Sequence, residues 1–115
     1  MEQLNRVELI GHIGSISINR ISGNQYGRFS VATSYAYKSK DGTPVIDTTW
    51  HNVLAWQEQG TVALESLTRG DAVHVVGRIR VVRCTTESGA DRVVTEVIAS
   101  KVEKVAGDSP FPQEG

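Results

Sequence analysis

The sequence of 115 residues contains one cysteine, Cys84, few aromatic residues and no long apolar run. A single cysteine excludes an internal disulfide and gives no sign of an oxidising compartment. No apolar stretch reaches the roughly 18 residues that a membrane-spanning helix needs. The first ten residues, MEQLNRVELI, lack the basic start and apolar stretch of a secretion signal. These absences predict a cytoplasmic protein, and the length of 115 residues predicts a single domain.

Patterns of catalysis and of metal binding are also missing. The three histidines, His12, His51 and His74, are far apart in sequence and are not accompanied by paired cysteines. The sequence has no G-x-S-x-G element, no P-loop and no dinucleotide-binding glycine pattern. Acidic residues do not cluster in the extended segments, as a metal-dependent nuclease would require. We therefore expect no cofactor, no metal site and no enzymatic activity.

Charge of either sign is not in large excess, since the formal net charge is −1. Its distribution is more informative than its sum, because a cationic stripe attracts phosphate whatever lies on the far side. Arg78, Arg80 and Arg83 fall within six residues with no acid among them, and Lys38 and Lys40 form a second cluster. With no acid expected nearby, both clusters are candidate phosphate contacts, although a solvated surface would have the same composition.

Hydrophobic alternation predicts five strands and one short helix. The predicted strands are residues 5–14, 26–37, 48–56, 72–82 and 91–105. The helix is predicted over residues 57–67, where Gly70 follows an apolar side and suits the end of a helix. Glycine bends in the first and fourth strands complete the pattern of an all-β, five-stranded Greek-key OB-fold barrel with one short helix between strands 3 and 4. Residues 1–105 would form this domain, and residues 106–115 a short disordered tail.

The segment TTWHNVLAW, residues 48–56, carries the clearest functional pattern. Its alternation places one set of residues on an outer face: Thr48, Trp50, Asn52, Leu54 and Trp56. The inner face carries Thr49, His51, Val53 and Ala55. Two large aromatic side chains on one outward face are usually covered by something flat and apolar. A nucleic-acid base and a second protein subunit are both suitable, and the pattern alone leaves the two open.

Several stretches together resemble the bacterial single-stranded DNA-binding protein family over residues 4–105. They are NRVELIGHIG, FSVATSYAYKSKDG, TTWHNVLAW, LTRGDAVHVVGRIR and SGADRVVTEVIA. The combination of T-x-W-H-x-V with the G-R-I-R strand and the S-G-x-D-R hairpin is fairly specific, whereas each piece alone is weak. The resemblance implies a homotetramer, or a dimer, that binds single-stranded DNA in replication, recombination or repair.

By position, the resemblance implies that bases stack on Tyr37, Trp50 and Trp56. It implies that five basic residues contact phosphates: Lys38, Lys40, Arg80, Arg83 and Arg6. Asn52 stands at a further position that contacts DNA. Tyr37 shares the phase of the expected core residue Phe29, so the strand would have to twist or bulge before Tyr37 faces solvent. The resemblance also places His51 at the subunit interface, and Val7 and Leu9 would form an exposed strand edge that pairs with another copy.

The sequence departs from the family at three places. Cys84 stands where a stacking tryptophan is common, and Asn52 and Val82 stand where basic residues are usual. The tail AGDSPFPQEG has an internal Pro110-Phe111 instead of a long linker with an acidic tip, so recruitment of repair enzymes through it is doubtful. These departures keep a second hypothesis open: an OB-fold interaction or primosome-accessory module whose outer aromatics are covered by another subunit.

Overall fold

A computed structural model describes residues 2–58 and 60–105, which form a closed five-stranded barrel with strand order β1-β2-β3-β5-β4. All neighbouring strands are antiparallel except β3 and β5, which are parallel. This arrangement confirms the predicted OB-fold barrel. The tail over residues 106–115 lies outside the described residues. The elements are β1 (Val7–Ile21), β2 (Asn24–Lys38), β3 (Pro44–Trp56), the 3-10 turn η1 (Leu64–Ser66), β4 (Ala72–Thr85) and β5 (Asp91–Lys104).

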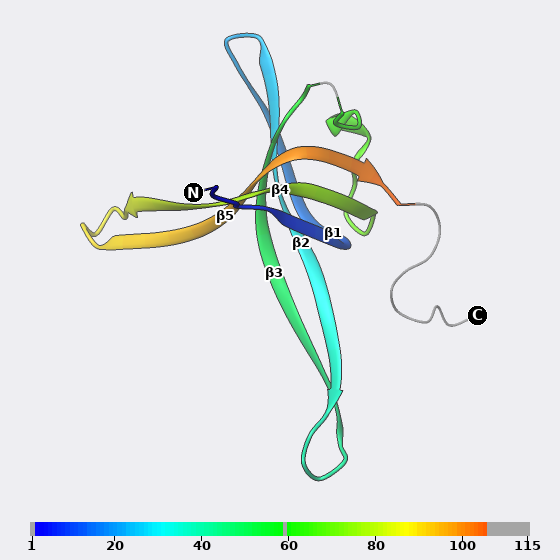
Figure 1. Ribbon diagram of the computed structural model, residues 1–115. Helices are drawn as coiled ribbons and strands as arrows, with labels where there is room; N and C mark the ends of the chain where they lie inside the picture. The colour runs from blue at the N-terminus through cyan, green and yellow to red at the C-terminus, as the bar shows by residue number, and fades with distance from the viewer. Residues whose placement is uncertain (1, 59, 106–115) are drawn as a thin grey trace.

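Four of the strands are longer than predicted because they continue beyond the barrel as two-stranded arms (Figure 1). The β1–β2, β2–β3 and β4–β5 hairpins point away from the barrel in different directions. The prediction that the first strand ends at Gly14 is wrong: β1 changes partner at His12, from β4 to β2, and continues to Ile21. A register shift between Ile13 and Ile16 accompanies this change.

The helix predicted over residues 57–67 is reduced to the single 3-10 turn η1. The side chain of Gln57 explains why the backbone between Gln57 and η1 is not helical. Its Nε2 donates to the carbonyl oxygens of Thr61 and Val62 at 3.2 Å each, and its Oε1 accepts from the backbone N–H of Leu64 at 2.7 Å. These bonds replace helical ones, and the fully buried Leu64 joins the barrel core.

The core lies inside the barrel and is built by the inward phase of every strand. Its buried members, in addition to Leu64 and Leu67 of the connection, are Leu9, Ile13, Phe29, Val31, Val53, Ala55, Val73, Val75, Val97, Ala99 and Val102. The β4 strand bends at Gly77, beside a register shift with β5. A Cβ at Gly77 would overlap the backbone of Ile98, so glycine lets the two strands approach closely there.

Candidate nucleic-acid interface

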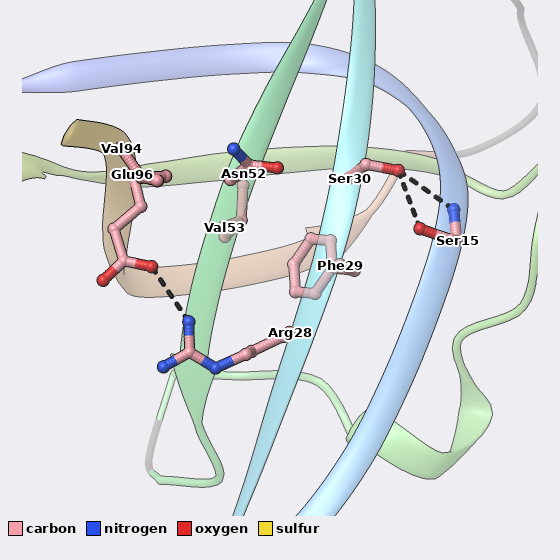
Figure 2. Close-up of a pocket in the computed structure, with 8 residues that line it drawn as sticks. All are labelled: Ser15, Arg28, Phe29, Ser30, Asn52, Val53, Val94 and Glu96. Atoms are coloured by element: carbon pink, nitrogen blue, oxygen red, sulfur yellow. Dashed lines mark hydrogen bonds and ion pairs between the residues drawn. The ribbon is translucent and has the colours of Figure 1, made fainter. Parts of the chain in front are cut away.

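A row of polar residues crosses the outer face of the barrel at right angles to the strands. Three register pairs follow one another across the strands. Ser30 of β2 lies opposite Asn52 of β3, and Asn52 lies beside Glu96 of β5. Glu96 in turn lies opposite Arg80 of β4. Ser15 of β1 extends the row, since its backbone N–H donates to the Ser30 hydroxyl at 3.0 Å (Figure 2). All five strands therefore contribute to one polar band.

The acid in this row, Glu96, is buried and paired with two arginines. Arg28 Nη1 donates to Glu96 Oε2 at 3.0 Å across β3, and Arg80 Nη2 donates to Oε1 at 2.5 Å. The expectation that no acid lies near Arg80 is wrong, because Glu96 comes from the next strand along the chain. Neither Arg28 nor Glu96 was among the predicted site residues. The shared phase of Arg28 and Ser30 on one predicted strand is the only sequence signal for Arg28.

This row borders a surface hollow of about 330 Å³, shown in Figure 2. Its lining combines hydroxyl, amide, guanidinium and carboxylate groups with apolar side chains: Ser15, Arg28, Phe29, Ser30, Asn52, Val53, Val94 and Glu96. The volume is at the lower end of the range for small-ligand sites. Phe29 and Val53 also belong to the barrel core, so the groups that this hollow offers are mainly polar and charged, and they suit a ligand that carries charge.

Trp50 lies beside this hollow. It precedes Asn52 by two residues on β3, and its side chain is therefore on the same outer face. Its side chain is exposed, with a relative accessibility of 58%. The ring lies against Gly14 of β1, where any Cβ would overlap it. Trp50 also lines a neighbouring hollow together with Ser30 and Arg69. The structure therefore presents Trp50 as an open aromatic surface flanked by polar groups.

Trp56, predicted to be equivalent to Trp50, has a different environment. It is half-buried, and its ring packs on Tyr26 with centroids 5.1 Å apart and an angle of 44° between the planes. Tyr26 is its register partner on β2, which the sequence analysis did not identify because the pairing register was unknown. One face of Trp56 is thus already occupied by protein, and only Trp50 is free over most of its surface.

Tyr37 is exposed, as predicted, but for a different reason. The β2–β3 register runs without a shift from Tyr26 opposite Trp56 to Lys38 opposite Pro44, so no bulge lies in this stretch. The strands instead leave the barrel as an arm, and no core remains to cover Tyr37. Its ring lies 6.0 Å from that of Tyr35, which has the same phase. By alternation, this tyrosine pair lies on the opposite face of the β2–β3 ribbon from Trp50.

The tip of the β2–β3 arm carries the exposed Lys38 and Lys40. Between the strands, Asp41 accepts hydrogen bonds from the Ser39 hydroxyl and from the backbone N–H of Thr43, the latter at 2.9 Å. These bonds lower the pKa of Asp41 to about 2, with that from Ser39 the largest cause. The tip therefore carries two cations and one permanent anion at neutral pH.

The remaining predicted cations lie away from the polar row. Arg83 is exposed on the β4–β5 arm, where Cys84 is an exposed free thiol. Arg6 and Arg78 line a separate hollow of about 410 Å³. The structure thus gathers Trp50, Asn52 and Arg80 and disperses the other predicted contacts over the arms and the N-terminal segment.

The residues predicted at a subunit interface differ in how far their side chains are exposed to solvent. Leu9 has a relative accessibility of 9% and belongs to the barrel core, so its side chain is not exposed as expected, although residues 7–11 pair with β4 and not with β2. Val7 is half-buried and packs against that core. His51 is half-buried and shares a hydrogen bond of 2.8 Å between its Nε2 and the Thr33 hydroxyl. Burial lowers the pKa of His51, which favours its neutral form.

Metal-binding groups and membrane-spanning helices are both absent from the described part of the chain. Over residues 2–58 and 60–105, no three His, Cys, Asp or Glu side chains are grouped so that they could hold a metal ion. Within the same ranges, no helix has the length and apolar character needed to cross a membrane.

Comparison with known proteins gives a consistent result. Residues 4–105 match the model of the single-strand binding protein family. The chain is 32% identical over 108 residues to a "Single-stranded DNA-binding protein" of Xylella fastidiosa, a match that covers 92% of this chain and 66% of the relative. It is 30% identical over 106 residues to the protein of the same description from Neisseria meningitidis, covering 90% of this chain and 61% of that one. The chain therefore spans less than two thirds of the length of these relatives.

Solved structures show the same fold at lower sequence identity. The "Plasmodium falciparum SSB complex with ssDNA" superimposes with a TM-score of 0.77 at 22% identity, covering 94% of this chain and 98% of that one. A small single-stranded DNA-binding protein from Streptomyces coelicolor superimposes with a TM-score of 0.69 at 22% identity, covering 92% and 97% of the two chains.

Proposed function

The chain belongs to the single-strand binding protein family, and from this premise we propose that it binds single-stranded DNA with little sequence preference. The observation that carries the proposal is the exposed ring of Trp50 beside a polar row that includes Arg80 and borders Arg28. Every base has a π-face, so stacking on Trp50 would tolerate any sequence and contribute about 1–3 kcal/mol per base.

The phosphates of the strand would be held by basic residues around this surface. Arg28 and Arg80 lie at the polar row, and the exposed Lys38, Lys40 and Arg83 lie on arms that a bound strand would reach as it leaves the barrel. Arg6 would be a further contact, and Asn52 would donate or accept hydrogen bonds from its position between Ser30 and Glu96. Cation contacts of this kind release counterions, so affinity should fall steeply with salt.

The biological role that follows is to coat and protect exposed single strands during replication, recombination or repair, without catalysing a reaction. Such a protein would act in the cytoplasm, on the nucleoid. We further propose a homotetramer, or a dimer. In either, Val7, His51 and the exposed Ile10 of β1 would lie near the interface, because the β1 segment 7–11 pairs with β4 and not with β2.

Titration of the purified full chain with oligo(dT) at low and at high salt tests this proposal. The Trp56→Phe variant removes the partly covered tryptophan, so its emission reports on Trp50 alone. We expect quenching on addition of oligo(dT) and its reversal by salt. Emission that does not change in either protein, together with no binding in a gel-shift assay, would reject the proposal.

One observation favours a second function, that of a protein-interaction module. Trp56 is already half covered by Tyr26, and the exposed Ile79, Val81 and Val93 of the β4–β5 arm are apolar. A partner protein would cover these side chains and Trp50 together. Under this alternative, emission from Trp50 is blue-shifted in the free oligomer and insensitive to oligo(dT).

A further inference from the structure

Glu96 holds two arginines that come from different strands. Its side chain has a relative accessibility of 7%, whereas those of Arg28 and Arg80 are 57% and 42%. Each carboxylate oxygen accepts from one guanidinium: Oε2 from Arg28 Nη1 at 3.0 Å, and Oε1 from Arg80 Nη2 at 2.5 Å. We call this arrangement the Arg28–Glu96–Arg80 bridge. The Glu96 carboxylate is therefore buried, whereas both guanidinium side chains are partly exposed to solvent.

The charges of the bridge do not cancel. One carboxylate against two guanidiniums leaves a net charge of +1, shared by two side chains that border one hollow or its polar row. A phosphate cannot displace Glu96 from both arginines, since a buried carboxylate without a partner is strongly destabilising. An incoming anion must therefore bind to the bridge as a whole.

Donor groups remain for such an anion. A guanidinium has five N–H donors in a planar fork that suits phosphate oxygens, and the bonds to Glu96 use one nitrogen of each arginine. Arg80 Nε is buried and has no hydrogen-bond partner among the described residues, so this side chain is not fully satisfied by Glu96. Arg28 is the more exposed of the two and is better placed to meet a ligand in the hollow.

From this geometry we infer that Arg28, Glu96 and Arg80 act as a single phosphate-binding unit of net charge +1 beside Trp50, with Arg28 as a DNA contact. The inference rests on the proposed binding of single-stranded DNA. Glu96 is a positioning residue: it orients both guanidiniums and limits their joint charge to that of one cation. The ligand is one backbone phosphate of the strand whose base stacks on Trp50.

The net charge of the bridge determines how much it contributes to the salt dependence of binding. Each phosphate neutralised on a single strand contributes about 0.7 to the slope of log K against log salt. Two independent arginines would contribute about 1.4 to this slope, whereas the bridge, with its net charge of +1, contributes about 0.7. Arg28→Gln should therefore lower the slope by about 0.7. When the salt concentration rises fourfold, the variant should then lose about 2.6-fold less affinity than the wild type loses. Glu96→Gln should raise the slope by the same amount.

The experiment measures oligo(dT) affinity of the full chain at four or more salt concentrations, by tryptophan fluorescence. The variants are Arg28→Gln, Arg28→Lys, Glu96→Gln and the double variant Arg28→Gln/Glu96→Gln. We expect the double variant to return to the wild-type slope, since its net charge is again +1, and Arg28→Lys to keep that slope. Arg20→Gln is a matched control, because Arg20 is an exposed arginine paired with Glu65 at 3.9 Å on the β1–β2 side.

The outcomes separate the inference from the proposed function. Wild-type protein that does not bind oligo(dT) would reject the proposed function. Wild-type protein that binds, with a slope unchanged in both Arg28→Gln and Glu96→Gln, would overturn only the inference. If thermal unfolding shows that Glu96→Gln is not folded, the double variant Arg28→Gln/Glu96→Gln decides: a wild-type slope supports the unit, and a slope lower by about 0.7 overturns it.

Discussion

The ring of Trp50 on β3 lies against the backbone of Gly14 on β1, so closely that any side chain at position 14 would overlap it. Two strands that are not register partners at this point are thus in contact through one aromatic ring. Gly14, the predicted end of the first strand, thus makes room for the more exposed of the two tryptophans.

Gly14→Ala should displace the Trp50 ring and weaken stacking. We expect a loss of about 1 kcal/mol in the free energy of oligo(dT) binding, within the ~1–3 kcal/mol of one stacked base. Titration of Gly14→Ala in the Trp56→Phe background measures the effect on Trp50 alone. Affinity and emission equal to those of the parent would contradict the observed contact.

The two tryptophans should respond differently to replacement by alanine. Trp50→Ala should lose about 1–3 kcal/mol of binding free energy with little change in the free energy of unfolding. Trp56→Ala should lower the free energy of unfolding, because the aromatic pair with Tyr26 contributes about 0.5–1.5 kcal/mol beyond its buried area. Urea unfolding and oligo(dT) titration of both variants test this contrast, and equal effects on binding would show that the two rings have the same role.

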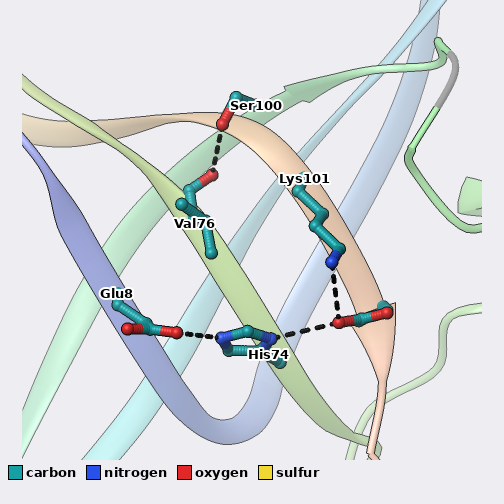
Figure 3. Close-up of polar contacts among 6 residues, drawn as sticks. Glu8, His74, Val76, Ser100 and Lys101 are labelled. Atoms are coloured by element: carbon teal, nitrogen blue, oxygen red, sulfur yellow. Dashed lines mark hydrogen bonds and ion pairs between the residues drawn. The ribbon is translucent and has the colours of Figure 1, made fainter.

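The stability of the barrel should depend on the protonation of His74. His74 Nε2 lies 2.6 Å from Glu8 Oε2 (Figure 3). Its Nδ1 lies 3.2 Å from Glu103 Oε1, which also pairs with Lys101 at 3.3 Å. The hydrogen bond to Glu8, followed by that to Glu103, raises the pKa of His74 above 6.5. The stabilisation is therefore fully present below about pH 6.5 and is lost as the pH rises through the raised value.

The measurement is urea unfolding of the wild type and of His74→Gln between pH 5.5 and 8.5. The difference in stability between the two proteins should shrink as the pH increases. Glu8→Gln, which removes the larger cause of the pKa shift, should reduce that pH dependence without abolishing it. A constant difference across the range would mean that the pKa of His74 is the same in the folded and the unfolded protein.

Leu64→Ala should destabilise the barrel by about 2–5 kcal/mol, as for other buried leucines. Leu64 is fully buried in the core although it lies in the 3-10 turn outside the strands. Denaturant unfolding measures the loss, and Ala63→Gly serves as a control at the exposed neighbouring position. A loss below about 1 kcal/mol would show that the core closes without this side chain.

The strand pattern was predictable because it is local. Alternation in residues 48–56 correctly placed Val53 and Ala55 inside and Trp50 outside, since successive side chains of a strand point to opposite faces whatever it pairs with. It did not predict that Leu54, on the same face as Trp50, is buried at 6% exposure, because alternation does not show what covers the outer face. The helix over residues 57–67 was overestimated because the side chain of Gln57 takes the backbone groups that helical hydrogen bonds would use.

The sequence by itself determined the all-β barrel, the inward and outward phase of its strands and the exposed ring of Trp50. Only the tertiary structure decided which groups meet around that ring. Glu96 lies 16 residues from Arg80 and 68 from Arg28, and no local pattern relates them. They come together because closing the barrel sets the register across β2, β3, β5 and β4, and that register depends on pairing between strands distant in sequence.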